Sequence, residues 1–141
     1  MNYTIQEKYT RLSGIAIFLT SVFTTVHHVY RLGLELLIPF GIIIILPITL
    51  LYFYQHKRRK SILWVYGLVN LLIFIALSFF DGFLDHTFKA IGLAPITFLE
   101  RSDAEVVETV FSLWSPNASY IFYELTGIMT FVMGTIAIFY T

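Results

Sequence analysis

The chain has 141 residues, of which 57% are hydrophobic and 13% are charged, and its formal net charge is zero. A soluble domain is about a quarter charged, so this composition excludes an ordinary water-exposed globular surface and favours one that faces lipid. The sequence has no cysteine, which excludes disulfides, thiolate metal sites and redox dithiols. The length predicts a single domain.

Four apolar stretches are each long enough to cross a bilayer, which takes about 20 apolar residues. They predict an all-α fold, a four-helix transmembrane bundle that forms one integral membrane domain over residues 1–141. The first stretch is longer than the apolar core of a signal peptide and ends in HHVYR, so we interpret it as a retained span. The predicted spans are residues 12–31, 36–55, 62–84 and 118–140.

Four basic residues, Lys57 to Lys60, separate the second span from the third. Cationic loops between spans stay in the cytoplasm, so this run predicts an inner loop and, with four spans, two cytoplasmic termini. Nucleic-acid binding is the other interpretation of a basic run, and the flanking spans argue against it. We therefore expect the protein to lie in a lipid bilayer, the plasma membrane of a bacterium. We expect no nucleic-acid partner.

The third and fourth spans are joined by a long segment, residues 87–117, on the predicted outer side. Within it, Ser102 to Trp114 has apolar residues at helical spacing, and Ser102 with Glu105 forms a capping-box pattern. The pattern predicts a short amphipathic interfacial helix over residues 102–114, which lies on the membrane surface or closes over the bundle.

The predicted topology separates the charges. The inner side carries six of the nine basic residues and one acid, Glu7, whereas eight of the nine acids lie outside or in the outer half of the membrane. With a helix rise of about 1.5 Å per residue, three spans carry ionisable side chains to a similar depth in that outer half. The predicted pocket comprises His27, His28, Arg31, Asp81, Asp85, His86 and Glu124.

Polar residues recur at helical spacing, so three spans each turn a polar face toward the bundle. His27 and His28 are consecutive and point about 100° apart, so they need not share a role. In the fourth span, Gly127 and Gly134 permit close helix approach. The polar faces comprise Thr20, Thr24, His27 and Arg31 in the first span and Asn70, Ser78, Asp81 and Asp85 in the third.

Ionisable groups within a membrane are costly and usually face a cavity or a partner. We expect the pocket to bind a divalent transition metal, zinc or iron, or a proton-linked ligand, because imidazole and carboxylate suit such metals. No HxxxH, ExxH or HExxH motif supports this, and adjacent residues such as Asp85 and His86 rarely bind one ion. The predicted metal ligands are His27, His28, Asp85, His86 and Glu124.

Three other functions stay open. Chains of Asp, Glu and His mark proton or ion pathways, which would make the protein a translocating subunit of a homo-oligomer. Arg31 could instead pair with Asp81, Asp85 or Glu124 in a structural charge network, as in a non-catalytic accessory subunit of a larger membrane complex. The last alternative is an intramembrane metal-dependent enzyme, although the sequence has neither a nucleophile elbow nor a phosphate loop.

Overall fold

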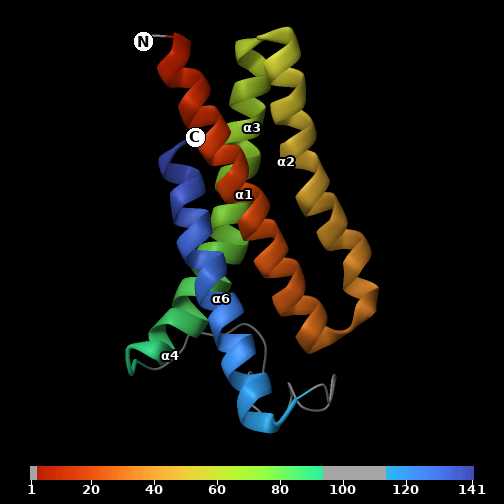
Figure 1. Ribbon diagram of the computed structural model, residues 1–141, viewed down its shortest axis with the longest axis vertical. Helices are drawn as coiled ribbons and strands as arrows, with labels where there is room; N and C mark the ends of the chain where they lie inside the picture. The colour runs from red at the N-terminus through yellow and green to blue at the C-terminus, as the bar shows by residue number, and fades with distance from the viewer. Residues whose placement is uncertain (1–2, 94–113) are drawn as a thin grey trace.

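The computed structural model describes residues 3–93 and 114–141, and this part of the chain is helical with no strand (Figure 1). The predicted amphipathic helix at 102–114 falls almost wholly outside the described residues. The elements are α1 (Tyr3–Leu32), the 3-10 turn η1 (Leu34–Leu36), α2 (Leu37–Lys57), α3 (Lys60–Ile73), the π-helix η2 (Phe74–Thr87), α4 (Phe88–Ala90) and α6 (Pro116–Phe139).

Four helical stretches are long and apolar enough to cross a membrane. The third of them is continuous through α3, η2 and α4. Helix α1 begins at Tyr3 rather than at residue 12, because Gln6, Lys8 and Arg11 are good helix formers that extend the helix beyond its apolar part. The four stretches are Gln6–Leu32, Leu34–Lys57, Lys60–Ala90 and Pro116–Phe139.

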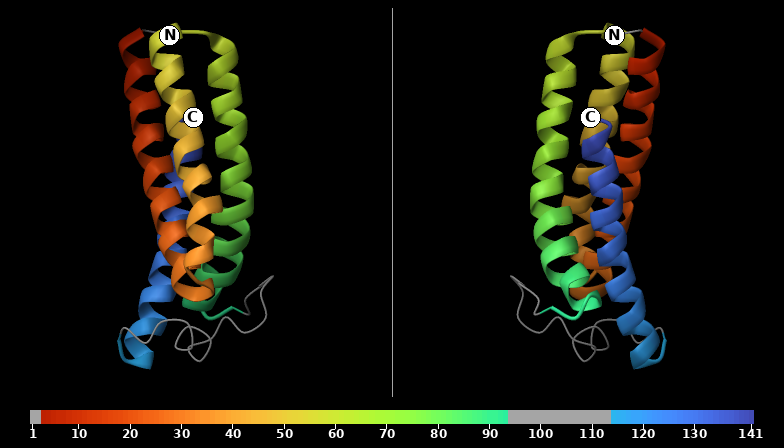
Figure 2. Two further views of the ribbon diagram at one scale, coloured as in Figure 1. Left: turned by 90° about the vertical axis from the view of Figure 1, so that its right-hand side faces the viewer. Right: turned by 90° about the vertical axis from the view of Figure 1, so that its left-hand side faces the viewer.

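The long helices alternate in direction (Figures 1 and 2). Both ends of the chain and the turn between α2 and α3 therefore lie at one end of the bundle. The connection between α1 and α2, helix α4 and the start of α6 lie at the other end. This antiparallel arrangement brings the C-terminal part of α1 beside η2 and the N-terminal half of α6. The residues of the predicted pocket lie on these three segments.

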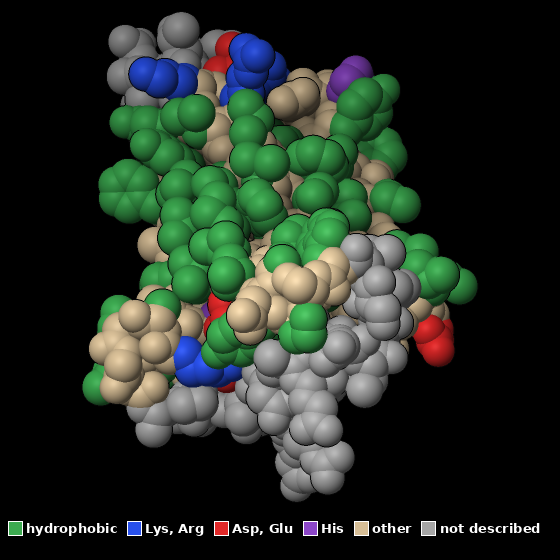
Figure 3. Space-filling view, turned by 60° about the horizontal axis from the view of Figure 1, so that its bottom comes forward, with side chains coloured by type: hydrophobic (Ala, Val, Ile, Leu, Met, Phe, Trp, Pro, Cys, Tyr) green, Lys and Arg blue, Asp and Glu red, His purple; other side chains and the backbone are tan. Residues whose placement is uncertain are grey.

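Large apolar side chains cover the sides of the bundle (Figure 3). Trp64 is 80% exposed and Ile38 is 78% exposed, with many other leucine, isoleucine and phenylalanine side chains around them. Lys and Arg side chains gather at one end, beyond this hydrophobic belt. An apolar surface of this extent is rare on soluble monomers and is compatible with lipid.

Small residues bring η2 and α6 into close contact. A Cβ atom on Gly82 would lie 2.8 Å from the carbonyl oxygen of Gly127, and one on Gly134 would overlap the hydroxyl of Ser78. Gly127 and Gly134 thus permit the close helix approach that their spacing predicts. Helices α1 and η2 both pack against α6, and their shared interior holds polar side chains, whereas α2 packs on the outside of α1 and α3.

Candidate metal centre

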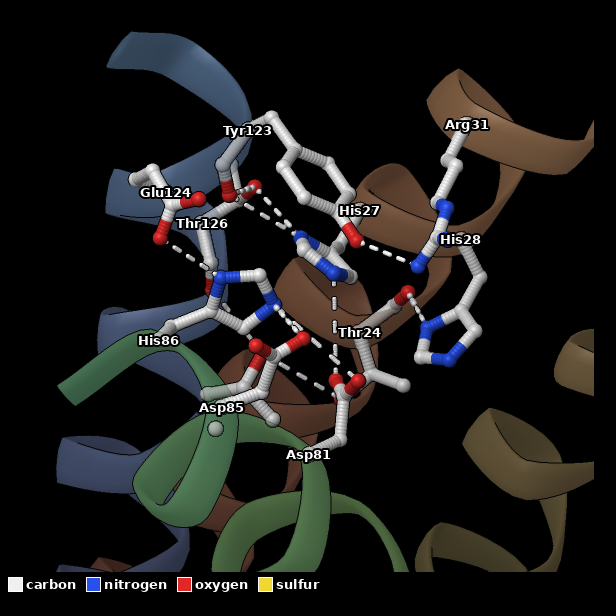
Figure 4. Close-up of polar contacts among 12 residues, drawn as sticks. Thr24, His27, His28, Arg31, Asp81, Asp85, His86, Tyr123, Glu124 and Thr126 are labelled. Atoms are coloured by element: carbon white, nitrogen blue, oxygen red, sulfur yellow. Dashed lines mark hydrogen bonds and ion pairs between the residues drawn. The ribbon is translucent and has the colours of Figure 1, made fainter. Parts of the chain in front are cut away.

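The backbone between Phe74 and Thr87 winds as a π-helix, in which hydrogen bonds join residues five apart. In an α-helix, residues four apart share a face and residues five apart do not. The wider π turn brings both spacings to one side, so Asp81, Asp85 and His86 all point into the bundle (Figure 4). All three residues belong to the predicted pocket, and the π winding is the local geometry that points them the same way. Segments of π-helix are rare and are often found at functional sites.

His27 extends from α1 into the centre of this group and is 1% exposed. Its Nδ1 lies 3.0 Å from the carbonyl oxygen of Tyr123 and 3.1 Å from the Thr126 hydroxyl, and its ring stacks on Tyr123. A carbonyl oxygen only accepts hydrogen bonds, so Nδ1 carries the proton and Nε2 of the neutral ring carries a lone pair. That Nε2 faces Oδ2 of Asp81 at 3.8 Å.

His86 carries its proton on the same ring nitrogen as His27, and it is completely buried. Its Nδ1 lies 2.8 Å from Oε2 of Glu124, and a carboxylate accepts hydrogen bonds, so Nδ1 again carries the proton. Its Nε2 faces Oδ2 of Asp85 at 3.8 Å and Oδ1 of Asp81 at 4.0 Å. Among the described residues this nitrogen has no hydrogen-bond partner.

His28 completes the set of imidazoles. Its Nδ1 lies 3.0 Å from the carbonyl oxygen of Thr24, one turn earlier in α1, and its ring packs against Phe40 of α2. The carbonyl again assigns the proton to Nδ1, which leaves Nε2 as the nitrogen able to bind a ligand. Unlike His27 and His86, His28 is only half-buried.

These residues form two groups with the spacing of metal ligands. One group is His27, His28 and Asp81, and the other is Asp81, Asp85 and His86; within each, one ligand atom from every residue lies within 4.8 Å of the others. Ligands of a tetrahedral zinc lie about 3.3 Å apart, given metal–ligand bonds of about 2.0–2.2 Å. Small side-chain movements would therefore let either group close on an ion.

Glu124 lies behind His86 rather than inside either group. Its Oε2 contacts Nδ1 of His86, and its Oε1 accepts a hydrogen bond from Nζ of Lys89 at 2.8 Å. Lys89 also lies 3.4 Å from Oδ1 of Asp85. Sequence reasoning left Lys89 out of the pocket, although its position one helical turn after Asp85 was a usable signal.

Arg31 reaches the pocket from the end of α1 and is 3% exposed. Its Nη1 donates a hydrogen bond to the Tyr123 hydroxyl at 2.8 Å. Among the described residues, Arg31 forms no ion pair with the three carboxylates considered for it, those of Asp81, Asp85 and Glu124. Tyr123 is completely buried and touches the rings of both His27 and His86. Tyr123 does not stand out in the sequence, because its contacts with the two histidine rings depend on how α1 and η2 pack against α6.

The chemistry of the pocket follows from which of its atoms donate hydrogen bonds and which accept them. Two imidazole lone pairs, from His27 and His86, meet two carboxylates, from Asp81 and Asp85, and the facing atoms lie 3.8–4.0 Å apart. These separations exceed hydrogen-bond lengths. Acceptors that face one another in a buried site are costly unless a donor or a cation lies between them: a metal ion, added protons or a bridging water.

Comparisons of the chain with protein-family models, with curated proteins and with solved structures find no significant match. The geometry of the pocket is therefore the one indication of function that the molecule offers among its described residues.

Proposed function

We propose that the protein is an integral membrane protein that binds one divalent transition metal ion, zinc or iron, between Asp81, Asp85 and His86. The observation that carries the proposal is the unpartnered Nε2 of the buried His86, which faces two carboxylates. Imidazole and carboxylate together suit zinc and iron.

The surroundings of the imidazoles support a metal over an accidental cluster. Histidines that bind metals almost always donate their other ring N–H to a carboxylate, a carbonyl or a water, which fixes the tautomer and aims the lone pair. His86 donates to Glu124 and His27 donates to the Tyr123 carbonyl. We therefore assign Glu124 the role of orienting His86, in place of the role of direct ligand.

Charge also favours a divalent ion at this position. Asp81 and Asp85 together supply two negative charges, which balance the ion, and Lys89 lies 3.4 Å from Asp85 and 2.8 Å from Glu124. Three acids, Lys89 and one divalent ion leave the buried site nearly neutral, which is less costly in a low-dielectric bundle than three acids with Lys89 alone.

The positive-inside rule orients the bundle. The basic turn Lys57 to Lys60 lies at the end that also holds both ends of the chain, and that end is cytoplasmic. The pocket lies toward the opposite end of the helices, in the outer half of the membrane.

Elemental analysis of protein purified in detergent without added metal tests the proposal. We expect about one zinc or iron per chain, and its loss in His86→Ala. His56→Ala is the matched control, because His56 is an exposed histidine on α2, and it should keep the ion. A folded wild-type protein that holds no metal and takes up none from added zinc would contradict the proposal.

Proton transfer is the second candidate function. The chain of contacts from His86 through Glu124 to Lys89 favours it, because each link lies at 2.8 Å. Proton flux into liposomes that contain the wild-type protein, abolished by Glu124→Gln and unaffected by metal chelators, would support this function over metal binding.

A further inference from the structure

We propose that His27 and His28 form a loading position for the ion, from which Asp81 passes it to the resting position at Asp85 and His86. The inference rests on the metal binding proposed above. It assigns separate roles to the two ligand groups and makes Asp81, their one shared member, the residue that connects them.

The two oxygens of Asp81 face different groups. Oδ2 lies 3.8 Å from Nε2 of His27, and Oδ1 lies 4.0 Å from Nε2 of His86. An ion held by one oxygen of this carboxylate can therefore move to the other without first leaving Asp81. Transfer by exchange of one ligand at a time avoids the cost of a bare divalent ion inside the bundle.

Charge sets the direction of this transfer. The loading position offers one carboxylate and two neutral imidazoles, so a divalent ion there keeps one unbalanced positive charge. The resting position offers two carboxylates, from Asp81 and Asp85, together with His86, whose basicity is raised by its hydrogen bond to Glu124. The ion is therefore held more tightly at the resting position.

The loading position is also more exposed than the resting position. Asp85 is 2% exposed and His86 is 0% exposed, so the two residues that belong to the resting position alone are both buried. Asp81 and His28 are half-buried, and the Asp81 side chain is 18% exposed. His28 lies about one helical turn before the end of α1, so it is the histidine of the pocket that an arriving ion can reach.

Charge further implies that the positions are filled alternately. Asp81 and Asp85 together balance one divalent ion, and Glu124 balances the neighbouring Lys89. Metals in two-ion sites lie about 3.5–4 Å apart, and a second divalent ion at that distance would leave a large excess of positive charge in a buried site. One ion per chain is the expected stoichiometry.

The rate of metal loading tests this inference apart from the affinity. Metal-free protein in detergent is mixed with Co²⁺, and the visible absorption of the bound ion is followed in a stopped-flow instrument. His28→Ala should slow loading and release by the same factor, at least tenfold, and leave the final spectrum, affinity and one-ion stoichiometry unchanged.

Two further variants guard against a folding defect. His28→Gln removes the imidazole but keeps a side-chain donor near the Thr24 carbonyl, and it should slow loading in the same way. His56→Ala is the matched control, because Nδ1 of His56 lies 2.8 Å from the Tyr52 carbonyl, the same local bond that His28 makes; it should load at the wild-type rate.

Three results would overturn the inference while leaving metal binding intact. They are an unchanged loading rate in both His28 variants, an altered final spectrum that makes His28 a resident ligand, and two Co²⁺ ions per wild-type chain. A wild-type protein that binds no Co²⁺, Zn²⁺ or Fe²⁺ would instead overturn the proposed function, and this inference with it.

Discussion

Two buried polar clusters lie between the same helices, toward opposite ends of the bundle. The first, which we call the hydroxyl cluster, comprises Ser13, Tyr66, Asn70 and Thr141. Ser13 Oγ lies 2.8 Å from the Tyr66 hydroxyl and 2.7 Å from the Thr141 hydroxyl, and Asn70 donates to Thr141 at 2.9 Å. The second is the candidate metal centre around Asp81, where the facing atoms lie 3.8–4.0 Å apart.

The two clusters differ in which hydrogen-bond donors and acceptors they contain. A hydroxyl group both donates and accepts, so the hydroxyl cluster satisfies itself, and among its side-chain atoms only Oδ1 of Asn70 lacks a described partner. In the candidate metal centre imidazole lone pairs face carboxylates, so its acceptors do not satisfy one another. Both clusters are buried, so burial of polar groups does not distinguish a candidate binding site in this molecule. The distinguishing feature is that hydrogen-bond acceptors face other acceptors.

The largest expected effect comes from Asp81→Asn. This change removes the one carboxylate that both ligand groups share. We expect zinc affinity to fall at least a hundredfold, which corresponds to about 2.7 kcal/mol. Competition titration against a coloured zinc chelator measures it. An affinity within threefold of the wild type would show that the acceptors around Asp81 do not hold the ion.

Gly127→Ala should damage the same centre through packing. An added Cβ would overlap the His86 ring, and forcing a methyl group into a packed core costs about 1–3 kcal/mol. The melting temperature in detergent should fall and zinc affinity with it. Gly41→Ala is the matched control, because a Cβ there meets no atom within 4 Å and alanine favours a helix; its melting temperature should not fall.

Glu124→Gln tests whether the carboxylate behind His86 is a ligand or an orienting group. A glutamine oxygen still accepts from Nδ1 of His86 but lacks the charge. Loss of such a supporting group typically costs 10–100-fold in metal affinity, so we expect about a tenfold loss with the ion still bound. Glu35→Gln, an acid on η1, should change nothing. Complete loss of the ion would make Glu124 a direct ligand.

The smallest effect on the metal is expected from the hydroxyl cluster. Ser13→Ala removes the partner of the Tyr66 hydroxyl, and an unsatisfied buried polar group costs about 1–3 kcal/mol. Thr20→Val should cost less, because Thr20 donates only to the carbonyl of Ala16 in its own helix. Chemical unfolding in detergent measures both, and zinc affinity should stay within twofold. A large loss of zinc from Ser13→Ala would remove the contrast between the clusters.

Much of the architecture was predictable, because hydrophobic runs report directly on long helices. All four apolar stretches are helical, and the depth estimate brought residues from three of them, such as His27, Asp81 and Glu124, to one level. The structure places these side chains in one pocket, within reach of one another or of His86 between them.

The local geometry was not predictable from spacing alone. The stretch from Phe74 to Thr87 winds as a π-helix that packs closely on α6 at Gly82, and no pattern in its sequence predicts that winding. Adjacent residues such as Asp85 and His86 rarely bind one ion on an α-helical period, whereas the structure groups both with Asp81. The roles of Glu124 and Lys89 depend on which atom faces which, and that is information that only coordinates carry.

The metal site is best examined by X-ray absorption spectroscopy at the zinc edge, on wild-type protein loaded with one equivalent of zinc. We expect nitrogen and oxygen ligands at about 2.0–2.2 Å, together with the multiple scattering of a bound imidazole, and loss of that signal in His86→Ala. A zinc shell of oxygen atoms alone, unchanged by His86→Ala, would contradict the proposed metal site.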